Sequence, residues 1–305
     1  MRTSQVTLPK VLVVCLNYRT AEMTLRSVRA ALRAMAGMNA ELVLVDNASG
    51  DGSVEVMQRA LDTEDWARGA PIRLIASDRN GGFGAGNNIG IRAGWSDGTR
   101  PDYVFLLNSD AFPAPDVLRL LVAHMQADPA CGFAGCYIHG DDGEEHLTTF
   151  RFPTLWSELD AGARLGPITR ALRNRVVPRP MHASGPVDWL AGAAVMMRDS
   201  VLREIGGFDE TFFLYFEETE LCLRAKRAGH GVHYLREAQV MHIGSVSTGM
   251  RRWERIPGFW LDSRAYFFGR CQGRAYAAGA LALRVLGETL FRLRRALTKS
   301  PQPDP

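Results

Sequence analysis

The sequence predicts an α/β fold with a mostly parallel central sheet and a helical C-terminal extension. Through residues 10–120, short apolar runs rich in β-branched residues alternate with segments of helical periodicity, which is typical of parallel strands joined by crossover helices. Three of these runs end in Asn or Asp. Residues 251–305, in contrast, combine leucines at helical spacing with many arginines.

The buried strands are the clearest elements of the first half. The run at 11–16 is apolar along its length, as expected of a strand that is covered on both faces, and the run at 72–75 is the weakest of the four. The predicted strands cover Val11–Leu16, Glu41–Val45, Ile72–Ile75 and Asp102–Leu107. Predicted helices include one marked by Leu25, Val28, Leu32 and Met35, one over about Asn87–Gly94 and one whose first turn holds Pro115.

The second half is less regular. Residues 151–182 hold four prolines and six arginines with little strand periodicity, so we expect a mobile, irregular excursion that passes over the functional site. The remaining predicted elements are a strand over Trp189–Met197, a helix from about Ser200, a turn at Gly206–Asp209 and a helix ending at Arg227.

Size and composition set limits on the architecture. With 305 residues, 46% of them hydrophobic, we expect a body over residues 1–250 and an extension over residues 251–305. No run of about 18 uncharged apolar residues occurs, and the apolar stretch at 11–16 is too short for a secretory signal, so neither is predicted. Five cysteines without a CxxC pair favour a reduced, cytoplasmic chain.

Polar side chains follow three of the predicted strands. They are Asn17, the pair Asp46-Asn47, and Asn108-Ser109-Asp110. In open parallel sheets, ligands bind beyond the carboxyl ends of the strands, so these residues are the first candidates for a site. We take Asp46 as functional, since it lies too early to cap the following helix, and Asp51-Gly52 as a turn. A hard divalent cation would suit the Asp110 carboxylate.

A glycine-rich segment, Asn80–Asn88, precedes a predicted helix. Its glycine spacing is that of a loop whose backbone cradles phosphate at a helix N-terminus. A tight helix start capped by Asn87 explains the same residues without a ligand, and the segment taken alone favours that interpretation.

The stretch Phe212–Cys222 is the most informative one. Aromatic and apolar residues lead directly into Glu217, Glu218 and Glu220. Carboxylates beside an aromatic wall lose hydration, which raises their pKa and suits a general base. An acidic first helical turn explains one or two of these acids. The isolated His242 is, on its own, more typical of a hydrogen-bonded core residue than of a ligand.

Taken together and in order, these segments resemble the family 2 glycosyltransferases, in particular the rhamnosyltransferase-like bacterial enzymes of cell-surface and cell-wall polysaccharide biosynthesis. The resemblance covers about residues 10–245. Its motifs are Val13–Tyr18, Val45–Ser53, Asn80–Asn88, Leu107–Asp110, Leu190–Ala193, Gly207–Glu210, Phe216–Cys222 and His242.

The resemblance implies a Rossmann-like nucleotide-diphospho-sugar transferase fold and metal-dependent, inverting transfer of a sugar to a hydroxyl. It implies that Asp46 contacts the nucleobase, that Asp110 and His242 bind Mg or Mn, and that the base is Glu218 by position or else Glu217. The donor side would comprise Asn17, Asp46, Asn80, Gly82, Asn87, Ser109 and Asp110, and the acceptor side Asp188 and Trp189.

The implied donor is dTDP-rhamnose or a UDP-sugar, and the implied acceptor is a glycan or a lipid-linked sugar. Two departures weaken the carry-over: Asn108 stands where many relatives have Asp, and Glu218 where they usually have Asp. A nucleotidyltransferase or a non-catalytic sugar-nucleotide-binding protein are therefore kept as alternatives. The glycine-free turn after Leu16 argues against the first of these. No nucleic-acid partner is predicted.

The C-terminal extension carries most of the positive charge. Residues 251–305 hold 11 basic and 4 acidic residues, whereas the other 250 residues hold 25 and 29. One predicted helical face carries Leu283, Leu286, Leu290, Leu293 and Leu297, and the other Arg284, Glu288, Arg292, Arg295 and Lys299. This pattern favours peripheral binding to the anionic inner face of the cell membrane. Packing of the leucine face on the catalytic domain or on a second subunit is the alternative.

Overall fold

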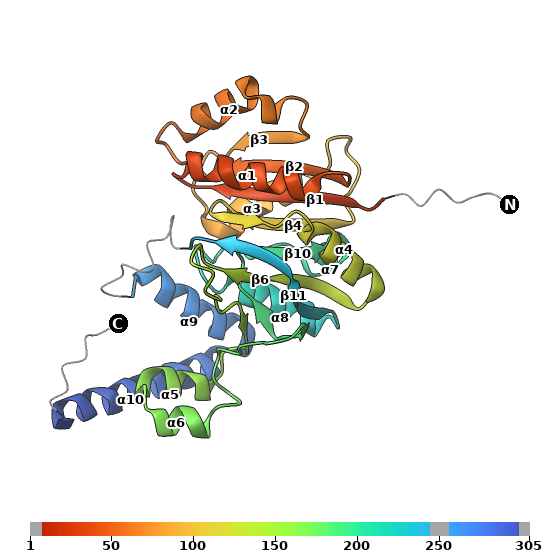
Figure 1. Cartoon of the computed structure of the whole chain (residues 1–305). Coiled ribbons are helices and arrows are strands. Elements are labelled where there is room, and N and C mark those ends of the chain that lie inside the picture. The colour runs from red at the N-terminus through yellow and green to blue at the C-terminus, as the bar shows by residue number, and fades with distance from the viewer. Residues whose placement is uncertain (1–7, 245–255, 299–305) are drawn as a thin grey trace.

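The computed structural model describes residues 8–244 and 256–298 (Figure 1). Within these ranges the main sheet has nine strands in the order β3-β2-β1-β4-β10-β6-β11-β5, and β8 pairs with β11. Its strands are β1 (Lys10–Asn17), β2 (Asn39–Asp46), β3 (Ile72–Ala76), β4 (Tyr103–Asn108), β5 (Ala111–Pro113), β6 (Cys131–His139), β8 (Gly185–Pro186), β10 (Ala194–Arg198) and β11 (Gly231–His242).

Parallel pairing places the functional strand ends side by side. β1 runs parallel to β2 and β4, and Asn17 pairs in register with Asp46 while Leu16 pairs with Asn108. β10 is antiparallel to both β4 and β6, whereas β6 and β11 are parallel to each other. The predicted α/β fold with a mostly parallel sheet is confirmed.

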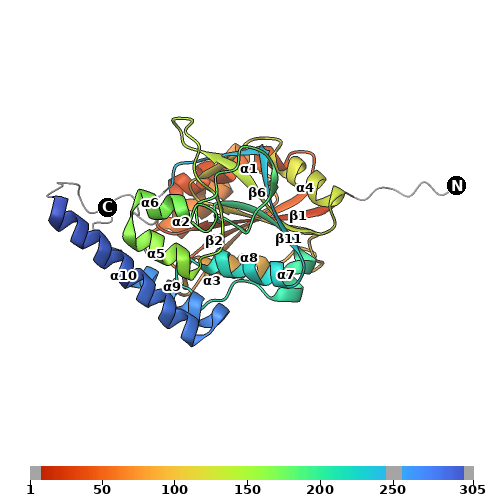
Figure 2. The same cartoon turned by 90° about the horizontal axis from the view of Figure 1, so that it is seen from below.

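Helices cover both faces of the sheet, as Figure 2 shows from below. Strand residues alternate between the two cores: Val11, Val13 and Cys15 face one, and Leu12 and Val14 face the other. The first core is closed by α1 (Ala21–Met35), α2 (Ser53–Thr63) and α4 (Val117–Ala127), and the second by α3 (Gly82–Ala93), α7 (Asp199–Ile205) and α8 (Glu217–Arg227). A short 3-10 helix, η1 (Asp65–Ala67), follows α2.

Two strand predictions were incorrect or incomplete. The apolar run 189–197 is not one strand, because β9 (Trp189–Leu190) pairs with β7 (Thr149–Phe150) in a separate small sheet, and only β10 joins the main sheet. The chain bends between them at Ala191–Ala193. β6 was missed, since its small residues (Cys131-Gly-Phe-Ala-Gly) lack the β-branched signature of a strand.

Residues 151–182 were also predicted incorrectly. They form the helices α5 (Leu155–Ala163) and α6 (Gly166–Ala171). The prolines flank these helices instead of interrupting them: Pro153 precedes α5, and Pro167 lies in the first turn of α6. Thr154 and Ser157 form a reciprocal capping box at the start of α5.

The helical C-terminal extension is confirmed as α9 (Gly258–Gln272) and α10 (Arg274–Thr298). α10 lies along α5 at the edge of the molecule (Figure 2). A methyl group added at Gly162 of α5 would lie 2.6 Å from the Arg284 carbonyl oxygen, and one at Gly287 would lie 2.6 Å from that of Leu159. A buried ion pair between Arg264 and Glu158 links α9 to α5. The expected boundary at residue 250 lies outside the described residues.

The faces of α10 differ from the predicted ones. Leu283 lies with Gly287 on the partly buried side, and Arg284, Arg294 and Arg295 also lie there rather than opposite the leucines. The exposed side is mostly apolar, with Leu281, Val285, Leu286, Leu290, Leu293 and Leu297 each at least 36% exposed, and it also carries Arg292. Lys299 lies outside the described residues. Among the described helices, none has the length and apolar character needed to cross a bilayer.

Candidate active site

A cavity of about 410 Å³ opens at the carboxyl ends of β1, β2 and β4. This is where the strand order reverses direction, between β1 and β4. Its lining comes from six parts of the chain: the ends of those strands, the segment Asn80–Phe83, the bend Ala191–Ala193, the segment Phe213–Glu218, His242 at the end of β11, and Phe259 of α9. Residues 151–182 contribute nothing to it. The expected excursion over the site is thus replaced by packing against α10.

Asn17 and Asp46 lie behind the cavity wall. The Asn17 amide donates to Asp46 Oδ1 at 2.7 Å, and Ser49 donates to the same carboxylate through its hydroxyl at 2.6 Å and its N–H at 2.9 Å. Asp46 is 1% exposed, and neither it nor Asn17 lines the cavity. These bonds hold the turn after β2 against the end of β1.

Asn47, which the sequence analysis only noted as a neighbour of Asp46, is the residue of this turn that faces the cavity. Its side-chain N–H donates to Asn80 Oδ1 at 2.9 Å and to the Gly82 carbonyl at 3.1 Å. Its buried Oδ1 has no hydrogen-bond partner among the described residues. An unpaired buried acceptor beside a cavity is suited to a donor group of a ligand.

The glycine-rich segment forms the start of α3 and packs this helix closely against β1. α3 begins at Gly82, earlier than predicted, so Asn87 lies inside the helix and donates to the Phe83 carbonyl at 3.0 Å instead of capping it. Gly86 and Gly90 allow α3 to lie directly on Leu16 and Val14 of β1. The segment thus serves packing, although Asn80, Gly82 and Phe83 do line the cavity.

Gly82, at the start of α3, packs against the backbone of Phe213 in the loop before the glutamates. Its φ of +87° is in the region that favours glycine, and a side chain there would overlap the backbone carbonyl of Phe213. That carbonyl accepts a hydrogen bond from the N–H of Phe83 at 3.0 Å. The glycine turn therefore fixes the loop that leads into the glutamates.

Asp110 and His242 meet at the cavity, as the resemblance implied. His242 Nε2 lies 3.0 Å from Asp110 Oδ1, although the two residues are 132 positions apart. Both line the cavity beside Ser109, and β5 and β11 pair Ala111 with His242. One carboxylate and one imidazole are suitable donors for a divalent cation, and the remaining coordination positions would be open to diphosphate or water.

Glu217 and Glu218 line the same cavity at the start of α8. Burial raises the pKa of Glu218 to about 7, and burial followed by repulsion from Glu218 raises the pKa of Glu217 well above its usual value. The Oε2 atom of each is buried without a hydrogen-bond partner among the described residues. Carboxyl groups with raised pKa values and unpaired oxygens in a cavity are candidates for proton transfer.

The turn before these glutamates is strained. Tyr215 and Phe216 have φ values of +69° and +71°, which large side chains adopt rarely. Tyr215 stacks on Phe259, and Phe213 meets the edge of the same ring. This aromatic rim of Phe213, Tyr215 and Phe259 was not predicted, because Phe259 lies far along the chain and carries no motif.

The two predicted acceptor-side residues lie elsewhere. Asp188 accepts from the Phe152 N–H at 3.2 Å and pairs with Lys226 at 3.5 Å. The Trp189 ring stacks on Phe150 at 4.2 Å between centroids. Neither residue lines the cavity.

Comparisons with known sequences agree with this geometry. Residues 10–183 match the family described as Glycosyl transferase family 2, and residues 103–299 match Glycosyl transferase family group 2. The chain is 28% identical over 285 residues to an N-acetylglucosaminyl-diphospho-decaprenol L-rhamnosyltransferase of Mycobacterium tuberculosis, covering 85% of this chain and 87% of that protein. It is also 28% identical over 165 residues to rhamnosyltransferase WbbL of Escherichia coli, covering 53% and 60% respectively.

Solved structures share the fold. The mannosyltransferase PcManGT from Pyrobaculum calidifontis, in complex with GDP-Man and Mn2+, superposes with a TM-score of 0.55 at 16% identity, covering 97% of this chain and 82% of that one. For S. aureus TarS 1-349 in complex with UDP the TM-score is 0.58 at 13% identity, with 94% and 91% covered. These neighbours are glycosyltransferases of the GT-A fold. The chain belongs to glycosyltransferase family 2, as a rhamnosyltransferase-like enzyme of glycan synthesis.

Proposed function

We propose that this enzyme transfers rhamnose or a related sugar, with inversion, from a nucleotide-diphosphate donor to a hydroxyl of a glycan or lipid-linked acceptor. One observation carries the proposal: the Asp110–His242 pair and the Glu217–Glu218 pair line a single cavity at the switch point of the sheet. The first pair suits a cation on a diphosphate, and the second suits removal of a proton.

The chain's own residues would act through a single displacement. A glutamate takes the proton of the acceptor hydroxyl, and the hydroxyl oxygen forms a bond to the anomeric carbon of the donor. The bond from that carbon to the diphosphate oxygen breaks, and the nucleoside diphosphate leaves with the electron pair. Since the acceptor arrives opposite the leaving group, the configuration inverts. We assign the base to Glu218, which is partly exposed, whereas Glu217 is 2% exposed.

Asp110 and His242 would hold the cation, Mg2+ or Mn2+. The imidazole favours Mn2+, because Mg2+ prefers oxygen ligands alone. When bound, such a cation stabilises the charge of the departing diphosphate. Because residue 108 is Asn, Asp110 supplies the carboxylate at the end of β4.

For the donor, dTDP-rhamnose is our first candidate and a UDP-sugar the second. The matched relatives support rhamnose, since two of them carry rhamnosyltransferase in their names. Asn80, Gly82, Ser109 and Asp110 line the cavity and would contact the donor, as would Asn47 through its unpaired oxygen. Asn17, Asp46 and Asn87 would position these residues from behind.

We place the acceptor at the aromatic rim, Phe213, Tyr215 and Phe259, next to the glutamates. A lipid-linked acceptor would also explain the exposed apolar side of α10, which we propose lies on the inner face of the cell membrane. Leu286, Leu290, Leu293 and Leu297 are exposed, whereas Leu283 lies on the partly buried side of the helix. Support for a membrane over a second copy comes from the curated relative that is named for a decaprenol-linked sugar.

The decisive experiment is radiolabel transfer from a panel of nucleotide sugars to a lipid-linked acceptor, with and without Mn2+. Asp110→Ala should lose transfer by several orders of magnitude, since loss of metal stabilisation costs several kcal/mol of barrier. Asp62→Ala, on the outer face of α2, is the matched control and should remain active. Full activity of Asp110→Ala, or donor binding by the wild type without turnover of any donor, contradicts the proposal.

A further inference from the structure

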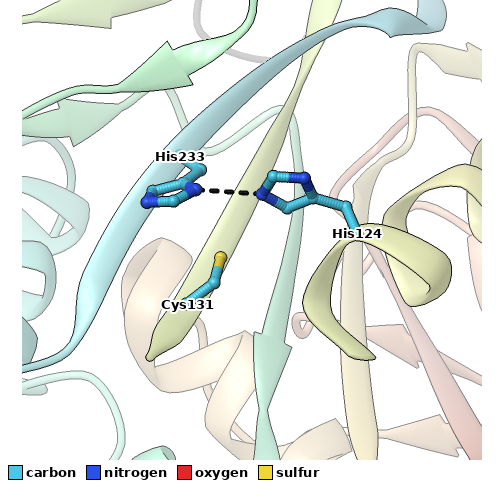
Figure 3. Close-up of side chains that lie close together, drawn as sticks. All are labelled: His124, Cys131 and His233. Carbon is cyan, nitrogen blue, oxygen red and sulfur yellow. Dashed lines mark hydrogen bonds between the residues drawn. The ribbon is translucent and has the colours of Figure 1, made fainter. Parts of the chain in front are cut away.

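A second group of metal-ligating side chains lies at the opposite end of the sheet. His124 comes from the last turn of α4, Cys131 begins β6, and His233 lies near the start of β11. Figure 3 shows the two imidazole rings and the sulfur pointing toward one another. Because β6 and β11 run parallel, this cluster lies at their amino ends, whereas His242 ends β11 on the side of the active site.

The distances are those of a nearly assembled coordination sphere. His124 Nε2 lies 2.9 Å from His233 Nδ1, and these nitrogens and the Cys131 sulfur all lie within 4.8 Å of one another. A tetrahedral Zn2+ with ordinary Zn–N and Zn–S bonds separates its ligand atoms by about 3.3–3.7 Å. Small side-chain rotations would therefore admit an ion.

A fourth donor is adjacent. Asp128 Oδ2 lies 3.8 Å from His233 Nδ1, while its Oδ1 accepts a hydrogen bond from the Ala130 N–H at 3.0 Å. The turn from α4 into β6 is tied by backbone bonds from Asp128 to His124 and from Cys131 to Asp128, both 3.0 Å. The turn thus holds three donors from an eight-residue span in fixed relation, and β11 supplies the fourth.

We propose that His124, Cys131 and His233, completed by Asp128, form a structural site for a borderline-soft divalent cation such as Zn2+. Two imidazoles, one thiolate and one carboxylate are a ligand set for Zn2+ and a poor one for Mg2+. Cys131 is 0% exposed, so its thiol would become a thiolate by releasing its proton when the ion binds. The bound ion would join α4, β6 and β11 at the end remote from catalysis.

A hydrogen bond between two neutral imidazoles is the simpler explanation of the same geometry. It accounts for the 2.9 Å contact, and Cys131 then only donates weakly to the Phe133 carbonyl at 3.3 Å. It does not explain why the buried Cys131 sulfur also lies within 4.8 Å of the ligand atoms of both histidines. Among the described residues, this is also the one group of three or more such side chains whose ligand atoms lie this close together.

The test uses Co2+ as a spectroscopic probe of the full-length protein after chelation and dialysis. One equivalent should produce a thiolate-to-cobalt charge-transfer band and intense tetrahedral d–d bands, which one equivalent of Zn2+ displaces. The Asp110→Ala variant should show the same spectrum, because the active site offers no sulfur. Cys131→Ser should lose the charge-transfer band, and His124→Ala or His233→Ala should bind Co2+ at least about tenfold more weakly.

Cys271→Ser and His182→Ala, whose side chains are not part of the cluster, are the matched controls and should keep the spectrum. Zn2+ should also raise the melting temperature of the wild-type protein and of Asp110→Ala, a readout that needs no cluster variant to fold. A wild-type protein without a charge-transfer band, or a band that persists in Cys131→Ser, overturns the proposal.

Discussion

At the scale of single residues, we assign the proposed proton transfer to the two glutamates of α8. Glu218 carries a pKa of about 7 because burial disfavours its charged form. The pKa of Glu217 is raised by burial and, in addition, by repulsion from the Glu218 carboxylate. The pair therefore holds at least one proton over much of the range below neutrality. A base with a pKa near the working pH combines availability with sufficient driving force for proton transfer.

This predicts the pH dependence of the reaction. Below pH 7 the base is protonated, so kcat/KM should fall about tenfold per pH unit, and above pH 7 it should level off. The measurement is kcat/KM for transfer between pH 5 and 9 at saturating Mn2+. A limb centred near pH 4.5, the ordinary value for Glu, would contradict a base whose pKa is raised by burial.

Substitution separates the two candidates. Glu218→Gln should bind the donor normally but transfer about 10²–10⁴-fold more slowly, as expected for a lost general base. Glu217→Gln should retain more activity and leave the pH limb nearly in place, because burial, and not the neighbouring carboxylate, raises the pKa of Glu218. Donor binding by calorimetry is the control for folding. The reverse ranking of the two variants would assign the base to Glu217.

The same burial has a cost in stability. A carboxyl whose native pKa is raised binds more protons folded than unfolded, so stability falls as pH rises from about 4.5 to about 7. Glu218→Gln should therefore be more stable than the wild type at pH 8, by on the order of 1–3 kcal/mol, and nearly equal to it at pH 4.5. Urea denaturation of both proteins at both pH values measures this difference. If the variant is no more stable than the wild type at pH 8, burial of Glu218 does not raise its pKa.

At the scale of elements, the start of α3 contacts the loop that leads into Glu217, through Gly82 and the backbone of Phe213. Gly82→Ala should destabilise the fold by more than about 1 kcal/mol, because the φ of +87° and the Phe213 backbone both exclude a side chain. Transfer should fall more than stability alone explains, since the loop before Glu217 would move. Gly98→Ala is the control: its φ is +77°, but no atom lies within 4 Å. Equal activity of the two variants would contradict this effect of the contact.

Helix α10 gives a prediction about membranes. With a mostly apolar exposed side and with Arg284, Arg294 and Arg295 on the partly buried side, binding to liposomes should depend more on buried leucine than on charge and should weaken only modestly with salt. Leu286→Ser/Leu293→Ser should reduce flotation with anionic liposomes by about tenfold or more. Leu147→Ser, an exposed leucine elsewhere, should not. Failure to float, together with concentration-dependent dimerisation in sedimentation, would assign this side to a second copy.

Elements with a strong local pattern were predictable. The first three strands and β4 are mostly apolar runs, and the sequence located them to within about two residues. The helices in 151–182 were hidden because proline suggests irregularity, although it also begins helices. The break at Ala191–Ala193 was hidden because pairing with β7 and β4, not local composition, ends the strand.

At the scale of the whole molecule, the site was only partly predictable. Strand ends located Ser109 and Asp110, the glycine-rich segment located Asn80, and the acidic turn located both glutamates. The contact between Asp110 and His242 depended on resemblance, since no local signal marks a residue pair 132 positions apart. Asn47 was overlooked in favour of Asp46, whose carboxylate is fully engaged by Asn17 and Ser49. Only tertiary structure shows which of two adjacent polar residues faces a cavity.

The close contact of Gly162 with the backbone of α10, and of Gly287 with that of α5, has a consequence for exchanging parts between homologues. Helices α5 and α10, more than 100 positions apart in the chain, therefore share one interface. Neither Gly162 nor Gly287 can be replaced there by a residue with a side chain without moving the other helix. A chimera that takes residues 251–305 from one parent and residues 151–182 from another would combine mismatched halves. Successful recombinants should therefore inherit both segments together, and natural sequences should vary at positions 162 and 287 in concert.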